Sequence, residues 1–161
     1  MKFKIQNRYN IQKFENICTE HHLLIRYTTP NFPYESEIKI GPFCIDNLHF
    51  CCHDVENPIS EFNKKIMLAY PQFYTTGIVY FPEDGGKQIL DFVHRNLASS
   101  KHRFNLIVCQ CDAGISRSRA TAAALSKIFN GNDDEYFGNA TPVNSTIYNN
   151  ILSSHYEQKP L

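Results

Sequence analysis

The hydrophobic positions follow two spacings, which predict short buried strands separated by amphipathic helices. Apolar-rich runs at HLLIRYTT (22–29), LHFCCH (48–53) and FNLIVCQ (104–110) are typical of strands. Helical spacing predicts helices over 10–18, over 60–69, after FPEDGG as far as residue 98, over 117–130, and from residue 144 or 145 onward. Helices that alternate with short apolar strands indicate an α/β fold, with a mostly parallel central sheet flanked by helices.

Length and composition narrow the class of protein. A chain of 161 residues fits one domain over 1–161, with a polar tail at 155–161 that we expect to fray. Sixteen basic and sixteen acidic residues balance, which argues against nucleic acid or an anionic membrane surface as partner. The chain has no apolar run near the roughly 18 residues that span a bilayer. Its start, MKFKIQNRYNIQKF, lacks the apolar core of a secretory signal. We therefore expect a cytoplasmic protein whose six cysteines are reduced thiols.

The stretch VCQCDAGISRSRATAAAL, residues 108–125, carries the strongest chemical signal. The chain leaves a buried strand at Cys111, turns through residues 112–116 and enters a helix near Arg117. Ligands bind at the carboxyl ends of parallel strands. A tight loop before a helix points backbone N–H groups inward, and the helix dipole adds positive charge. Gly114 permits a backbone conformation that other residues resist. The sequence therefore predicts an anion-binding loop.

The side chains of this loop suit one kind of chemistry. A cysteine that faces an anion-binding loop is stabilised as its thiolate, which is the nucleophilic form. The planar fork of Arg117 matches two oxygens of a tetrahedral oxyanion, and the hydroxyl of Ser118 can hydrogen-bond a sulfur atom. Together they predict attack by the sulfur of Cys111 on a phosphate ester.

The sequence CDAGISRS, residues 111–118, resembles the C-x5-R-[S/T] phosphate loop of the cysteine-based protein tyrosine phosphatases. It is most similar to the compact dual-specificity and bacterial or viral-type members. The resemblance is strong over 104–131, looser through LHFCCHDVENP and FPEDGGKQILDFV, and thin before residue 40. It implies a dual-specificity-phosphatase-like fold and a metal-free hydrolysis of phosphorylated protein through a phosphocysteine. The loop has an acid and no lysine, which favours phosphotyrosine over polyanionic phosphoinositides.

The resemblance also implies roles for individual residues. Cys111 attacks phosphorus, Ser118 assists the departing thiolate, and the side chain of Arg117 holds phosphoryl oxygens. Backbone amides also bind these oxygens, and they belong to Asp112, Ala113, Gly114, Ile115, Ser116 and Arg117. Gln110 stands where the family usually has histidine. Because glutamine cannot carry charge, we expect an activity optimum shifted to higher pH.

The leaving oxygen also needs a proton, which this family takes from an aspartate on a mobile loop. Asp54 is the preferred residue because it follows the apolar run 48–53 and precedes a loop that contains Pro58. Asp84 is the alternative, although its position before a periodic helix is typical of an N-cap. The separation between Asp54 and Cys111 exceeds that of the smallest family members. Residues 59–80 are therefore expected to form a lid or a substrate-recognition insertion.

Two other functions and a metal site compete with this interpretation. A rhodanese-type sulfurtransferase also places a cysteine loop before a helix, but it would not need Arg117 and Ser118 together with an aspartate on another loop. A pseudophosphatase would bind phosphoprotein without turnover, and Gln110 is the feature that favours it. The cysteines and the histidine of 51–53, and the cysteines of 109–111, lack the spacing of a structural zinc site. We therefore expect no metal and no cofactor.

Overall fold

The structure, a computed structural model, describes residues 1–31, 38–99, 103–138 and 142–157. Its strands are β1 (Lys2–Asn7), β2 (His22–Thr28), β3 (Cys44–Cys51) and β4 (Leu106–Cys111). Its α-helices are α1 (Arg8–Ile17), α2 (Glu61–Ala69), α3 (Gly85–Ala98), α4 (Arg117–Asn130) and α5 (Ser145–Glu157), with 3₁₀ turns η1 (Pro71–Tyr74) and η2 (Asp134–Tyr136). The described strands form one parallel sheet in the order β1-β4-β2-β3. The predicted α/β class with a parallel sheet is confirmed.

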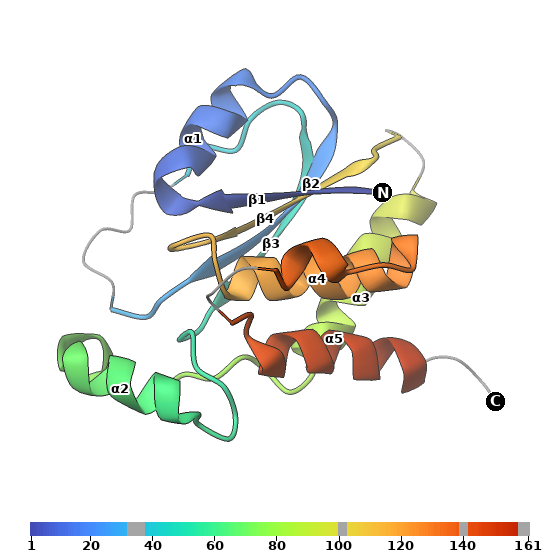
Figure 1. Cartoon of the computed structure of the whole chain (residues 1–161). Coiled ribbons are helices and arrows are strands. Elements are labelled where there is room, and N and C mark those ends of the chain that lie inside the picture. Colours follow the sequence, from blue (N-terminus) through green and yellow to red (C-terminus); the bar gives the residue numbers. More distant parts are fainter. Residues whose placement is uncertain (32–37, 100–102, 139–141, 158–161) are drawn as a thin grey trace.

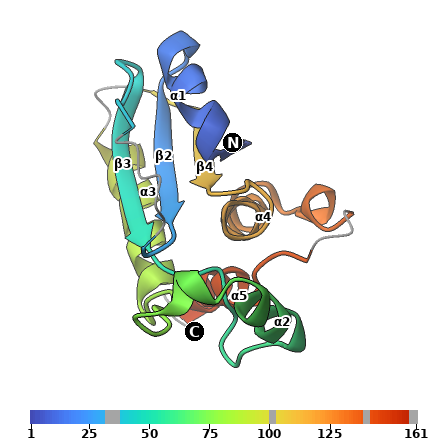
Figure 2. The same cartoon turned by 90° about the vertical axis from the view of Figure 1, so that its left-hand side faces the viewer.

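Helices cover both faces of the sheet (Figures 1 and 2). On one face, α1 packs Ile11 and Phe14 against Leu24, Leu106 and Val108. On the other face, α3, α4 and α5 enclose the larger core, to which β4 contributes the intervening side chains at 107, 109 and 111. Successive strand residues point to opposite faces, so β4 supplies both cores and all six of its residues are buried. That double burial explains its continuous apolar sequence.

The ends of several elements differ from the prediction. Strand β1 was not predicted, although exposed Lys2 and Lys4 alternate with half-buried apolar residues, the pattern of a strand with one exposed face. Strand β3 begins at Cys44, earlier than expected. Helix α4 has its predicted bounds and ends at Gly131, whose φ of 76° is the left-handed C-terminal conformation that glycine favours. Helix α5 includes 155–157 of the tail expected to fray, and 158–161 lie outside the described residues.

A buried ion pair joins α1 to the amino-terminal edge of the sheet. Oε1 of Glu15 lies 2.9 Å from Nε2 of His22, and Oε2 accepts the Gly41 N–H at 2.8 Å. The other ring nitrogen of His22 lies 2.9 Å from the carbonyl oxygen of Glu20. Burial alone would lower the pKa of His22, but its bonds to Cys44, Glu15 and the Glu20 carbonyl raise it to about 10. His22 is therefore charged in the folded protein at neutral pH.

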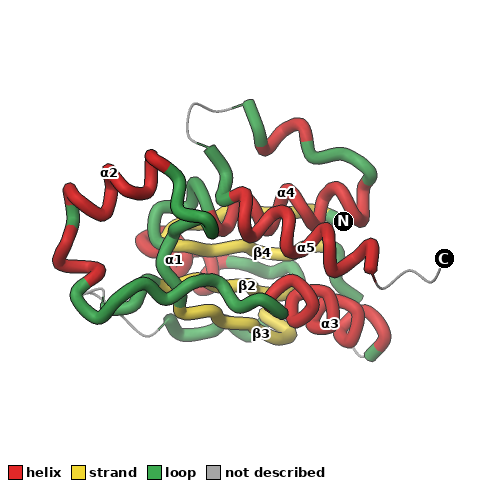
Figure 3. The backbone as a smooth tube through the Cα atoms, turned by 90° about the horizontal axis from the view of Figure 1, so that it is seen from below, coloured by secondary structure: helices red, strands yellow, loops and turns green. Residues whose placement is uncertain are grey.

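The carboxyl edge of the sheet faces a separate group of elements. Helix α2 lies at this edge, away from the helices that cover the sheet, and the N-terminus lies at the opposite edge (Figures 1 and 3). Helix α2 and η1 make up most of the expected insertion over 59–80. Among the described residues, none of the helices is long and apolar enough to cross a membrane.

Candidate active site

Cys111 is the last residue of β4, and its side chain is buried between the following loop and the first turn of α4. Its Sγ accepts a hydrogen bond from the Gly114 N–H at 3.2 Å and lies 3.1 Å from Oγ of Ser118. The structure therefore brings Ser118 and the Gly114 N–H to the sulfur of Cys111, although this N–H was expected to bind a phosphoryl oxygen. A backbone N–H and a hydroxyl directed at one sulfur atom are suited to hold negative charge on it.

The turn of the loop depends on glycine at position 114. Gly114 has a φ of 73°, in the left-handed region that side chains with a Cβ disfavour. A Cβ on Gly114 would also come within 3.1 Å of the Asn7 nitrogen and 3.2 Å of the Gln6 carbonyl carbon. The end of β1 therefore packs directly against the loop, and a larger residue at position 114 would require β1 to shift.

Arg117, the first residue of α4, ties the loop to the ends of two strands. One terminal nitrogen donates to the carbonyl oxygens of Thr28 at 3.1 Å and Cys52 at 2.5 Å. The other donates to Oγ1 of Thr29 at 3.0 Å and to Oδ2 of Asp112 at 2.6 Å. Only 2% of Arg117 is exposed, so these bonds fix the guanidinium inside the protein.

The third nitrogen of this guanidinium remains available. Nε of Arg117 is buried and makes no hydrogen bond with the residues that the structure describes. It lies 3.9 Å from Oδ2 of Asp54. Burial alone would lower the pKa of Arg117, but Asp54, Cys111 and Asp112 raise it above its usual value. A charged donor that has no hydrogen-bond partner among the described residues and belongs to the same loop as Cys111 is suited to bind an oxygen of an anionic ligand.

Asp112 differs from its expected role. The resemblance implies a role for its backbone amide, but the structure shows that its side chain also takes part in the loop. The carboxylate accepts from Arg8 at 3.0 Å and from Oγ1 of Thr29 at 2.5 Å, in addition to Arg117. The cause is the start of α1, which lies against the loop, since the Arg8 N–H also donates to the Asp112 carbonyl at 3.2 Å. Two guanidinium groups therefore flank this carboxylate.

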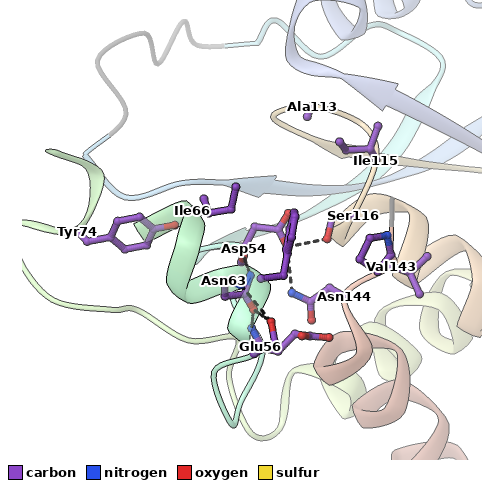
Figure 4. A pocket seen from close by; sticks show the side chains of 13 residues that line it. Asp54, Glu56, Asn63, Ile66, Tyr74, Ala113, Ile115, Ser116, Val143 and Asn144 are labelled. Carbon is purple, nitrogen blue, oxygen red and sulfur yellow. Dashed lines mark hydrogen bonds between the residues drawn. The ribbon is translucent and has the colours of Figure 1, made fainter. Parts of the chain in front are cut away.

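The structure places Asp54 beside the loop (Figure 4). Its Oδ1 accepts from Oγ of Ser116 at 2.9 Å and from Nδ2 of Asn144 at 3.0 Å. Its side chain is 34% exposed, which leaves room for a ligand. Asp84, the alternative acid, lies at the start of α3, where its carboxylate accepts from the side chain of Gln88 at 2.9 Å. Of the two candidates, Asp54 is therefore the one that touches the loop.

Asn144 is a site residue that the sequence did not reveal. As expected of a helix cap, its Oδ1 accepts the Ile147 N–H at 3.1 Å. Its amide nitrogen donates to Asp54, so the same side chain also orients the candidate acid. A helix cap uses only the side-chain oxygen of an asparagine. The amide nitrogen of Asn144, which the cap leaves unused, was therefore the one hint in the sequence that this residue has a second partner. No spacing rule connects that nitrogen to a loop ninety positions earlier.

Gln110 is buried in β4 on the face opposite Cys111. Its Oε1 is buried and has no hydrogen-bond partner among the described residues. A buried acceptor without a partner costs about 1–3 kcal/mol. The side chain of Gln110 therefore leaves one buried acceptor in β4, directly before the loop, without a partner among the described residues.

The insertion over 59–80 is fixed next to the site. His53 stacks on Tyr74 with ring centroids 4.8 Å apart. Its Nδ1 accepts the Val79 N–H at 2.9 Å, and its Nε2 lies 2.8 Å from the Phe73 carbonyl oxygen. Burial, and after it the charge of Asp54, raises the pKa of Tyr74. His53 thus holds the turn that carries Tyr74 close to the candidate acid.

A grouping with metal-ligand chemistry occurs at the opposite edge of the sheet. Among the described residues, Glu15, His22 and Cys44 have ligand atoms within 4.8 Å of one another. Glu15 and His22 already satisfy each other and nearby backbone groups. The geometry of the ion pair therefore needs no metal to account for it.

Comparison of the sequence with protein-family models and with curated proteins gave no match. Function is therefore inferred from the side chains that converge on the loop. These are the sulfur of Cys111, the available Nε of Arg117 and the carboxylate of Asp54.

Proposed function

We propose that this protein is a cysteine-dependent phosphomonoester hydrolase, of the tyrosine or dual-specificity type, that acts on phosphorylated protein in the cytoplasm. One observation carries the proposal. A buried cysteine sulfur, a guanidinium nitrogen without a hydrogen-bond partner and a carboxylate held by two side chains converge on a single loop. The same loop has the sequence of the phosphate loop that the cysteine-based phosphatases share.

In the first step, the thiolate of Cys111 attacks phosphorus and an S–P bond forms as the bond to the leaving oxygen breaks. Nε of Arg117 and the backbone N–H groups of 112–117 hold the nonbridging oxygens, except the Gly114 N–H, which donates to the sulfur of Cys111. Protonated Asp54 gives its proton to the leaving oxygen. The hydrogen bonds from Ser116 and Asn144 orient the carboxyl group for that transfer.

In the second step, the carboxylate of Asp54 takes a proton from water, and the water oxygen attacks phosphorus. The S–P bond breaks, inorganic phosphate leaves and the electron pair returns to sulfur. Ser118, with Oγ 3.1 Å from the sulfur, donates to the departing thiolate. Both steps use only side chains and backbone N–H groups of this chain, together with water.

The test is hydrolysis of p-nitrophenyl phosphate in EDTA, measured across pH for the wild type, Cys111→Ser and Asp54→Asn. We expect turnover by the wild type and none by Cys111→Ser. Asp54→Asn should lose roughly 10²–10⁴-fold in rate, the usual contribution of a general acid, together with the fall in rate that accompanies deprotonation of the acid.

Three results would contradict parts of this proposal. Full activity of Cys111→Ser would exclude the phosphocysteine. Full activity of Asp54→Asn would place the acid elsewhere, with Asp84 next in line. A wild type that binds vanadate but releases no p-nitrophenol would instead be a phosphoprotein-binding module, the pseudophosphatase that Gln110 favours.

A further inference from the structure

A cavity of about 450 Å³ opens beside the loop and shares Asp54 and Ser116 with the candidate active site. A cavity of about 150 Å³ is enough to enclose a benzene ring. This cavity has about three times that volume, so it can enclose an apolar side chain of a substrate whose phosphate is bound at the loop.

The walls of the cavity are largely apolar and come from separate segments. The apolar side chains that line it include Phe62 and Ile66 of α2, Ile115 of the loop and Val143 before α5. Asp54 lies between Ile66 and Val143 (Figure 4). Phe62 is 53% exposed and Ile115 is 44% exposed. Exposed apolar side chains that gather in a hollow with a polar rim are typical of a ligand-binding surface.

The charged residues that line the cavity, Asp54 and Glu56, are both acidic. Burial raises the pKa of Glu56, but hydrogen bonds from Ser145 and Ser60 lower it below its usual value, so this carboxylate is ionised at neutral pH. Among the described residues that line the cavity, none is a lysine or an arginine. An acidic group on a substrate would meet like charge here, whereas an apolar group would displace water from apolar walls.

Helix α2 is anchored to the segment that carries the candidate acid. The side-chain amide of Asn63 donates to the Asp54 carbonyl at 3.1 Å and accepts the Glu56 N–H at 2.9 Å. Asn63 is buried, so this contact fixes the apolar face of α2 at a set position relative to Asp54. A substrate group seated on Phe62 and Ile66 is thereby held in register with the acid.

We propose that this cavity, the α2 pocket, binds an apolar side chain next to the phosphotyrosine and so selects phosphoprotein segments with apolar rather than acidic flanks. The inference rests on the proposed phosphatase function and names its substrate class. Phe62 and Ile66 are then specificity-determining residues for substrate binding, separate from the residues that perform the reaction.

The test compares kcat/KM on three substrates. Two are phosphotyrosine peptides that differ only in having leucine or glutamate on both sides of the phosphotyrosine, and the third is p-nitrophenyl phosphate. The enzymes are the wild type, Phe62→Ala, Ile66→Ala and Leu68→Ala. Leu68 is the matched control, because it lies on α2, is 82% exposed and does not line the cavity.

We expect the wild type to prefer the leucine peptide by about 10-fold or more, the discrimination typical of an apolar pocket. Phe62→Ala and Ile66→Ala should each lower kcat/KM for that peptide by roughly 10-fold, mainly through KM. Their rates on p-nitrophenyl phosphate, and all rates of Leu68→Ala, should match the wild type.

Equal wild-type rates on both peptides, with p-nitrophenyl phosphate hydrolysed, would overturn the α2 pocket and leave the phosphatase function standing. Equal losses on both peptides in Phe62→Ala and Ile66→Ala would do the same. A wild type inert on all three substrates would overturn the phosphatase function itself, and the inference with it.

Discussion

The buried ion pair between Glu15 and His22 makes the stability of this protein depend on pH in a defined direction. Glu15→Gln keeps the size of the side chain and an acceptor for the Gly41 N–H but removes the charge that faces His22. Without that charge, only the bonds to Cys44 and to the Glu20 carbonyl oppose the burial that favours the neutral imidazole. The variant should therefore lose the stabilisation that comes from a protonated His22 in the folded state.

The sign follows from the two pKa values. The pKa of His22 is about 10 when folded and 6.5 when unfolded, so between these values the folded state holds one more proton. The free energy of unfolding then falls by about 1.4 kcal/mol for each pH unit as pH rises. Burial raises the pKa of Glu15, but bonds from His22 and Gly41 lower it overall, so its contribution is lost as pH falls below 4.5. The pair stabilises most between about 4.5 and 6.5.

Both residues are almost fully buried, at 1% exposure for Glu15 and 0% for His22, so solvent screens the pair little. Breaking a buried ion pair by removing one partner costs about 3–5 kcal/mol. We expect the free energy of unfolding of Glu15→Gln at pH 6 to be lower than that of the wild type by this amount. This difference should close progressively as pH rises toward 10.

The assay is urea unfolding followed by circular dichroism from pH 5.5 to 9.5 under reducing conditions. Glu61→Gln is the control, because its carboxylate pairs with Lys64 at the surface and is 81% exposed, where such a pair contributes about 0–1 kcal/mol. A gap between the wild type and Glu15→Gln that stays constant over this pH range would refute the reasoning.

Three further predictions concern the loop and the core. Gly114→Ala must adopt a φ of 73° with a Cβ 3.1 Å from the Asn7 nitrogen. Thermal melts should show a free energy of unfolding lower by about 1–2 kcal/mol. Turnover of p-nitrophenyl phosphate should show a lower kcat. Ser118→Ala should slow release of the thiolate, so a stopped-flow trace should show a burst of p-nitrophenol that the wild type lacks. Tyr27→Phe removes a buried 2.6 Å hydrogen bond to Thr121 and should cost roughly 1 kcal/mol in urea unfolding with turnover unchanged; a change in turnover instead would mean that Tyr27 acts on the site.

The elements next to the candidate site could be predicted from the sequence because local rules govern them. Strand β4 is buried on both faces, which produces a continuous apolar run, and Gly131 marks the end of α4 by its left-handed conformation. The turn between them requires Gly114 for its φ. Strand β1 was missed because its alternation of lysines with apolar residues covers only Lys2 to Ile5, too few positions to stand out from the helix that follows.

The contacts between distant segments could not be predicted, since no sequence spacing encodes them. Arg8 reaches Asp112 because β1 pairs with β4 in parallel, which brings the start of α1 to the loop. Asn144 reaches Asp54 because α5 packs beside the segment that follows β3. The position of Asp54 after an apolar run was visible in the sequence, whereas its hydrogen-bond partners depend on the tertiary fold.

The most direct test of the central claim is mass spectrometry of acid-quenched reactions between the enzyme and p-nitrophenyl phosphate. We predict one phosphoryl group on the peptide that contains Cys111, transient in the wild type and accumulated in Ser118→Ala. Product release with no phosphoryl group on Cys111 in either enzyme, or with the group on another residue, would contradict a phosphocysteine mechanism.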